Sequence, residues 1–158
     1  MRRAVMLVSV ALLGAFATGC GAHGTVATVA RHPPSCSMAP ARLVSSTLGL
    51  AAGDPMIVAR PPVLVCEYPQ GGVQSQTLSV RFQTGITSDM DRAGIENAPP
   101  PRFQPVTGLA DYAATAIQNG IRVLDADKYS IDLSVDAPAS VSLNDEKRLV
   151  RSVFAQLG

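Results

Sequence analysis

The dipeptide Asn119-Gly120 constrains the fold of this chain more than any other feature. It separates residues 112–118 from residues 121–124, and both segments are rich in apolar side chains. Asn-Gly tolerates the positive φ values that a two-residue type I′ turn requires, so the two flanking segments are expected to pair as an antiparallel hairpin.

A third strand is expected directly after this hairpin. Asp125-Ala126-Asp127-Lys128 predicts a second turn, and residues 129–135 alternate between apolar and polar side chains. Asp125 and Asp127 within that turn suggest half of a calcium loop, but the glycine and the distal glutamate of such a loop are missing. We therefore interpret them as solvated turn residues. The inward-facing residues of the third strand are expected to be Tyr129, Ile131, Leu133 and Val135.

The C-terminal residues predict an amphipathic helix that starts between Ser142 and Asp145. One face of this helix carries a continuous apolar stripe. We interpret the stripe as core packing against the sheet, with a partner-binding helix as the alternative. It is formed by Leu149, Val150, Val153, Phe154 and Leu157.

Two further helices are expected earlier in the chain. Residues 37–48 form the first, with Pro40 in its first turn and Gly49 as its stop. Residues 88–95 form the second, a short helix that Thr87 or Ser88 can cap.

Residues 63–68 and 77–83 read as strands that pair as another hairpin. Together these elements predict one α+β domain over residues 36–158, with an antiparallel sheet of about five strands packed by two or three helices. The proline-rich residues 97–102 are expected to be a plain loop, although such runs can also dock in aromatic grooves.

The N-terminal residues have the pattern of an export signal. Arg2 and Arg3 precede an apolar run over residues 4–17, which at 14 residues is shorter than the roughly 20 needed to span a membrane. The run ends in Ala17-Thr18-Gly19-Cys20, which resembles the cleavage and acylation site of bacterial lipoprotein signals. The alternative is an ordinary secreted protein, cut after an Ala-x-Ala-like site, in which Cys20 is incidental.

The lipoprotein resemblance implies that residues 1–19 are removed and that Cys20 carries the lipid. Residues 20–35 would then be a flexible tether, since they are small and polar and end in Pro33-Pro34-Ser35. Both histidines of the chain lie in this tether. We interpret them as incidental, with a metal-binding or pH-sensing pair as the alternative.

The chain has three cysteines. If Cys20 is lipidated, Cys36 and Cys66 remain, and in an oxidising compartment they are expected to form a disulfide. The bridge would close a loop of about 30 residues, worth roughly 3–4 kcal/mol in the chain-entropy model. Two free buried thiols or a metal pair are the alternatives.

Charge and motifs exclude several kinds of function. Loss of Arg2 and Arg3 leaves 11 basic against 12 acidic residues, so no basic surface for nucleic acid is expected. Residues 36–158 contain no histidine, which removes the usual Ser-His and Cys-His pairs. We therefore expect no enzyme, no cofactor and no metal site.

One local pattern has two interpretations. Gly108-Leu109-Ala110-Asp111 reads as a tight turn before a strand, in which the Asp side chain bonds its own backbone. The alternative places Asp111 and Tyr112 at the mouth of a pocket.

Four features together resemble small lipoproteins of the mycobacterial and related actinobacterial envelope, the LpqN-like group. They are Cys36-Ser37-Met38 at a helix start, Cys66-Glu67-Tyr68 on a strand, the Gly108–Asp111 turn and the final amphipathic helix. The resemblance implies a PsbP/Mog1-like sandwich on the extracytoplasmic side of the cell membrane, with a binding or assembly role. Its partner would be an envelope protein or an apolar ligand, and the chain itself a monomer. The alternatives are a lipid or glycolipid carrier and a small hydrolase.

Overall fold

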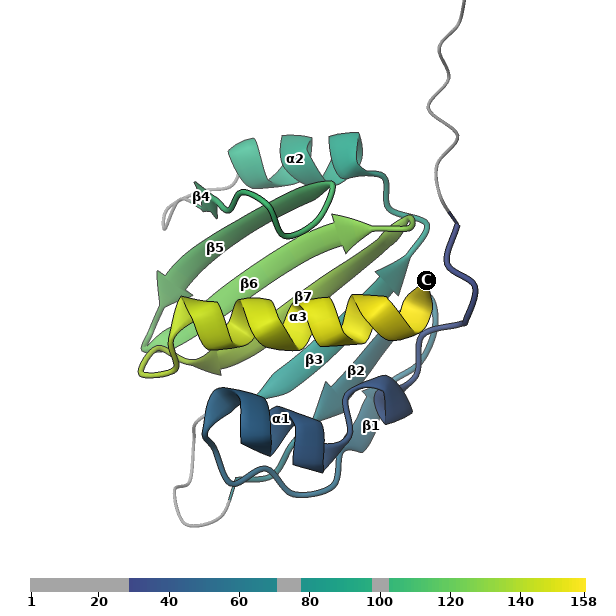
Figure 1. The fold of residues 1–158 in the computed structure, drawn as a ribbon. Coiled ribbons are helices and arrows are strands. Elements are labelled where there is room, and N and C mark those ends of the chain that lie inside the picture. Colours follow the sequence, from purple (N-terminus) through teal and green to yellow (C-terminus); the bar gives the residue numbers. More distant parts are fainter. Residues whose placement is uncertain (1–28, 71–77, 98–102) are drawn as a thin grey trace, which may run out of the picture.

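The computed structural model describes residues 29–70, 78–97 and 103–158. These residues form one antiparallel sheet with the strand order β1-β2-β3-β7-β6-β5-β4, together with three α-helices (Figure 1). The predicted α+β class is confirmed, with a larger sheet than expected. The strands are β1 (Met56–Ala59), β2 (Val63–Glu67), β3 (Ser79–Thr84), β4 (Gln104–Pro105), β5 (Tyr112–Gln118), β6 (Ile121–Lys128) and β7 (Ile131–Pro138).

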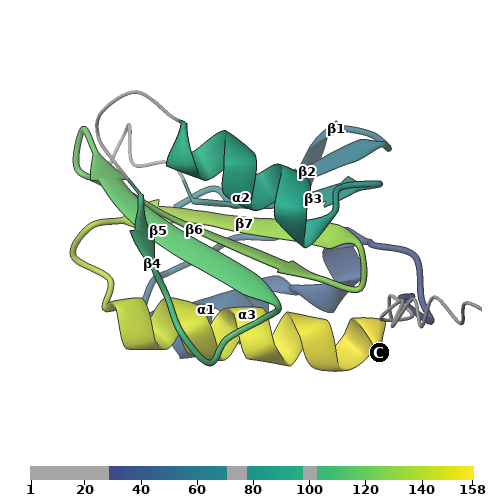
Figure 2. The ribbon, with the colours of Figure 1, turned by 90° about the horizontal axis from the view of Figure 1, so that it is seen from above.

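The helices lie on both faces of the sheet. α1 (Ala41–Leu48) and α3 (Leu143–Leu157) cover one face, whereas α2 (Ser88–Glu96) lies across the other (Figure 2). A 3₁₀ turn, η1 (Cys36–Met38), precedes α1. None of the helices in the described part of the chain is long and apolar enough to cross a membrane.

The predicted hairpin around Asn119-Gly120 is confirmed. Gln118 pairs with Ile121, and the two turn residues have φ values of 52° and 77°. The second turn lies further along the chain than predicted. β6 continues to Lys128, and the turn consists of Tyr129 and Ser130, at φ 59° and 57°.

The prediction that Asp125 and Asp127 are solvated turn residues is therefore wrong. Both are buried strand residues that pair across β6 and β7 with Ser134 and Asp132. Tyr129 is likewise a turn residue and not the first strand residue. The three charged residues within 125–128 suggested a turn, although Leu124 and Ala126 alternate with the two aspartates as strand residues do.

The main core lies between the sheet and the pair α1 and α3. All five residues of the predicted α3 stripe are buried, which confirms its packing against the sheet. Ile131, Leu133 and Val135 face the same core, as predicted. The largest side chains that are fully buried there include Phe82, Leu78, Leu124, Leu133, Leu149 and Leu157.

The first helix is shorter than predicted. Residues 36–38 form the 3₁₀ turn, and Pro40 is the N-cap of α1 with an extended backbone, φ −64° and ψ 152°. The residue before a proline is disfavoured in the α region, so Ala39 interrupts the helical path. Gly49 ends α1 as predicted, at φ 69°, and its N–H donates to Ser45 O.

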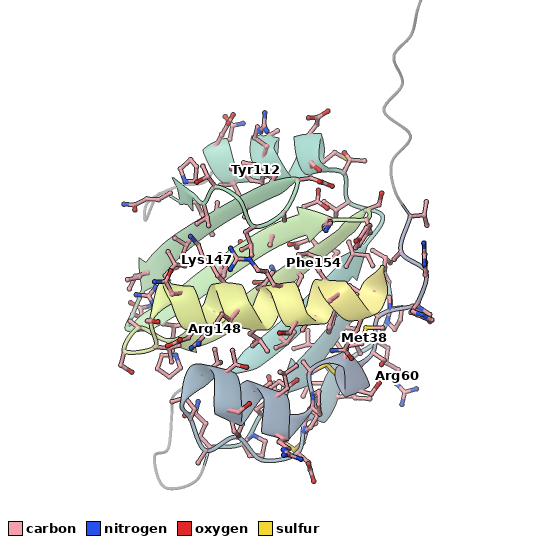
Figure 3. The ribbon with its side chains drawn as sticks, in the orientation of Figure 1. Met38, Arg60, Tyr112, Lys147, Arg148 and Phe154 are labelled. Atoms are coloured by element: carbon pink, nitrogen blue, oxygen red, sulfur yellow. A yellow bond between two sulfur atoms is a disulfide. The ribbon has the colours of Figure 1, made fainter. Side chains whose placement is uncertain are left out.

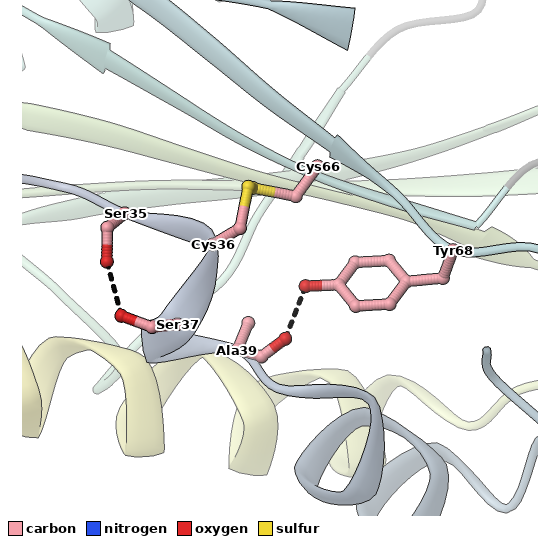
Figure 4. Close-up of a disulfide and its surroundings, with 6 residues drawn as sticks. All are labelled: Ser35, Cys36, Ser37, Ala39, Cys66 and Tyr68. Carbon is pink, nitrogen blue, oxygen red and sulfur yellow. Dashed lines mark hydrogen bonds between the residues drawn. A yellow bond between two sulfur atoms is a disulfide. The ribbon is translucent and has the colours of Figure 1, made fainter. Parts of the chain in front are cut away.

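The predicted pairing of Cys36 with Cys66 is present in the structure, with 5.7 Å between the two Cα atoms (Figure 4). Beside it, the buried Tyr68 hydroxyl donates a hydrogen bond to Ala39 O. Burial raises the pKa of Tyr68 far above its ordinary value, so the phenol keeps its proton. The bridge and the phenol together hold η1 and the start of α1 against β2.

Part of the predicted tether contacts the domain. Residues 29–35 form no helix or strand, yet the N–H groups of Arg31 and His32 donate to Leu157 O, at 2.7 and 3.3 Å. His32 is exposed. Cys20, His23 and the proline run at residues 99–101 lie outside the described residues.

Candidate functional site

The two faces of the central strands differ in chemistry. On β3, β6 and β7, alternate side chains point to the apolar core, and those between them point to the face that α2 crosses. This second face is polar and acidic, and we call it the polar sheet face. It carries Ser79, Arg81, Gln83, Asp125, Asp127, Asp132, Ser134 and Asp136.

Like charges lie directly opposite each other on this face. Asp127 pairs across the strands with Asp132, an arrangement that repulsion makes unfavourable in a sheet. Arg81 on the neighbouring strand compensates part of the charge. Its Nη2 lies 3.6 Å from Asp125 Oδ1 and 3.9 Å from Asp132 Oδ2.

Arg81 is also the accessible member of this cluster. Its side chain is 42% exposed, against 9% and 7% for the two aspartates that it approaches. Nearby, the Ser79 hydroxyl donates to Asp136 at 3.1 Å. Any binding partner would therefore meet the guanidinium first and the carboxylates only behind it.

The protonation of the cluster follows from its burial. Burial raises the pKa of Asp125, while Ser134 and Arg81 act to lower it and Asp136 to raise it further. Burial also raises the pKa of Asp127; the nearby Ser88 side chain lowers that pKa and the nearby Asp111 raises it. Both carboxyl groups thus hold their protons more readily than solvated aspartates do.

α2 lies over the polar sheet face with its own side chains largely exposed, although strand residues beneath it such as Asp127 and Ser134 are buried. Among the α2 side chains that the structure describes, none is buried, and Met90 is 59% exposed. The helix is held at its start by the Thr87 side chain, which accepts a hydrogen bond from Met90 N. Further along, the Arg92 guanidinium lies 5.2 Å from the centre of the Tyr112 ring. Tyr112 is labelled next to α2 in Figure 3.

A groove lies along each side of α2. The first, about 290 Å³, runs between α2 and the polar sheet face, with Arg81, Gln83 and Asp132 on the sheet side. Its other side is apolar and includes Ile86, Met90 and Ile95. We call this the α2 groove, and its lining suits a ligand with one charged and one apolar part.

The second groove, about 430 Å³, lies between α2 and the segment before β5. Asp111 and Tyr112 both line it, together with Arg92 and Glu96 of the helix. The predicted turn at Gly108 is also present, at φ 72°. The turn and a groove lined by Asp111 and Tyr112 are therefore both present, whereas the structure of the described residues shows no hydrogen bond between the Asp111 side chain and its own backbone.

Sequence reasoning missed Arg81, Asp132 and Asp136 as members of a site. A signal was available, because the polar positions of residues 79–83 and 130–136 alternate with apolar ones and so share a face of their strands. This alternation does not show that the two strands, β3 and β7, lie side by side in the sheet. In the described part of the chain, no group of three or more His, Cys, Asp or Glu side chains has an arrangement that could hold a metal ion.

A comparison with models of known protein families finds no match for this chain. Searches among curated proteins and among solved structures find no significant match either.

Proposed function

We propose that this protein is a lipid-anchored lipoprotein of the cell envelope and acts there as a non-enzymatic binding or assembly module. The lipoprotein-like Ala17–Cys20 site supports the anchor. The sequence resemblance to the LpqN-like group supports the envelope location, and a sheet with helices on both faces is consistent with a PsbP/Mog1-like sandwich.

The observation that carries the binding role is the exposure of the α2 side chains above the polar sheet face. Stable domains bury apolar side chains beneath their helices. α2 instead lies over charged strands without a buried side chain of its own among those described, and it leaves a groove on each side. Such an arrangement suits a surface whose contacts are completed by a partner.

The partner expected from this surface is an envelope protein that presents both charged and apolar groups. Arg81 would contact an anionic or carbonyl group, and Met90 and Ile95 an apolar one. A lipid carrier is less well supported, because Phe82, Leu133 and Leu149 fill the apolar layer on the other side of the sheet.

A small hydrolase is the second candidate, and the carboxylates of the polar sheet face are the observation in its favour. Raised pKa values of Asp125 and Asp127 are of the kind that acid–base catalysis uses. We prefer the binding role because both residues are almost fully buried, at 6% and 1% exposure, where a substrate does not reach them.

Photo-crosslinking in intact cells tests the binding role. A photoreactive amino acid at Met90 on α2 should capture an envelope component. The same group at Ile117, which is 52% exposed but lies on β5, should not. Arg81→Gln should reduce the Met90 product at least several-fold while the protein stays folded. No product from position 90, or equal products from both positions, would contradict the proposal.

A further inference from the structure

The outer edge of the sheet at β1 has an unusual composition. Among the described residues, β1 pairs only with β2, and its other side offers backbone groups that no described strand pairs with. Met56, Ile57 and Val58 are 54%, 59% and 51% exposed. Exposed edges are usually protected by charged mid-strand residues, by shortness or by bulges; β1 is short and its pairing with β2 shifts between Ile57 and Ala59, but its mid-strand residues are all apolar.

The charges of this edge lie at its two ends and have opposite signs. Asp54 precedes the strand and Arg60 follows it, and both are exposed. Arg60 points away from the body of the protein (Figure 3). The segment is self-complementary about Ile57. The apolar residues Met56 and Val58 lie one position from Ile57 on either side, and the oppositely charged Asp54 and Arg60 lie three positions from it.

We propose that β1 is a docking surface for a second copy of this chain, paired edge to edge and antiparallel about a twofold axis at Ile57. In this register Ile57 lies opposite Ile57 of the second copy, and Met56 opposite Val58. Asp54 lies opposite Arg60 of the second copy, and the symmetry forms this charge pair twice. The sheet would continue from one copy into the other.

Charge complementarity selects a second copy over an unrelated strand. An antiparallel copy in this register places opposite charges at both ends and apolar residues between them, whereas a parallel copy would place Asp54 beside Asp54 and Arg60 beside Arg60. The short strand implies a small interface, so the dimer should be weak and dependent on concentration. This proposal differs from the monomer expected from the sequence, and the oligomeric state in solution decides between them.

Charge reversal tests the register in the purified protein by sedimentation velocity over a concentration series. Asp54→Arg and Arg60→Asp should each weaken dimerisation at least tenfold, because each places like charges opposite one another twice. The double variant Asp54→Arg/Arg60→Asp should restore it. Arg42→Asp, a reversal at an exposed position on α1, is the matched control and should change nothing.

A photoreactive amino acid at position 57 identifies the occupant. Cells that hold two differently tagged forms of the chain should give a product that carries both tags. Position 90, equally exposed at 59%, should not give it. A product with a different protein at position 57, no product there, or dimerisation that the single reversals leave unchanged would overturn the proposal. The result is independent of what position 90 captures.

Discussion

At the scale of single residues, the buried pair of Glu146 and Arg122 stands out. Glu146 is fully buried in the first turn of α3, and one of its oxygens lies 3.6 Å from Arg122 Nη1. Burial raises the pKa of Glu146 to about 8, although Arg122 opposes the shift. Arg122 is held independently, because it also donates to the carbonyl oxygens of Val141 and Ala139.

Glu146 should make the protein less stable as the pH rises. Its pKa is about 8 in the folded state against 4.5 as the reference value, so the folded state binds the proton more tightly. The stabilisation is fully present below about pH 4.5 and is lost progressively up to about pH 8, on the order of a few kcal/mol.

Glu146→Gln should remove most of this dependence. Compared with the wild type, we expect a similar urea midpoint at pH 5 and a higher one at pH 8. Glu96→Gln, which alters an exposed carboxylate on α2, is the control and should leave both midpoints in place. If the urea midpoint falls equally between pH 5 and pH 8 in the wild type and in Glu146→Gln, the pH dependence of stability belongs to other groups, such as Asp125 and Asp127.

The burial of Glu146 could have been predicted from the sequence. It precedes Leu149 by three residues and Val150 by four, so it lies on the apolar face of the helix. Its acidic character is nevertheless typical of a solvated residue in the first turn of a helix. The partner could not be predicted, because it depends on the packing of α3 over β6.

At the scale of elements, the two hairpin turns of the meander compare directly. The turn at residues 119–120 contains the favoured Asn-Gly pair, and the sequence predicts it. The turn at residues 129–130 has the same positive φ values without a glycine, so local sequence does not reveal it. Tertiary contacts fix Tyr129 instead, since its ring packs edge-on against Phe154, with 6.3 Å between ring centres.

Ser130→Gly should stabilise the β6–β7 hairpin, because glycine adopts a φ of 57° without the strain that serine carries. The gain should be up to about 1 kcal/mol, with the contacts of Tyr129 unchanged. The matched control is the reverse change, Gly120→Ser at φ 77°, which should cost a similar amount. Chemical denaturation measures both, and a destabilising Ser130→Gly would show that the serine is favoured by other contacts.

The elements that the sequence left out are short or form an edge. β4 has two residues and β1 has four, too few for a clear alternation. Both complete the sheet only by pairing with longer strands, β5 and β2. The longer strands and helices were predictable because their apolar periodicity extends over enough residues.

At the scale of the whole molecule, the two faces of the sheet differ in predictability. The apolar face follows from alternation and from the α3 stripe. The polar sheet face does not, because Arg81 and Asp132 meet only when β3 lies beside β7, and that order is set by the packing of the entire domain. The candidate site thus depends on topology, whereas the core depends on local pattern.

The proposed anchor is also a property of the whole molecule, and it is separable from the domain. Cys20 lies outside the described residues, and the disulfide joins Cys36 and Cys66 without it. Cys20→Ala should therefore release a folded protein into the soluble secreted fraction, since the acyl chains that hold it are lost.

Fractionation and intact-mass measurement check this outcome. The wild type should show the mass of an acylated chain beginning at Cys20, and the released variant should keep the thermal midpoint of the wild-type domain. Thr18→Ala alters the same stretch and retains Cys20, so it should stay with the membrane. If Cys20→Ala remains with the membrane as firmly as the wild type, the lipid on Cys20 is not the anchor. An ordinary cleavage site, with Cys20 incidental, would instead put even the wild type in the soluble fraction.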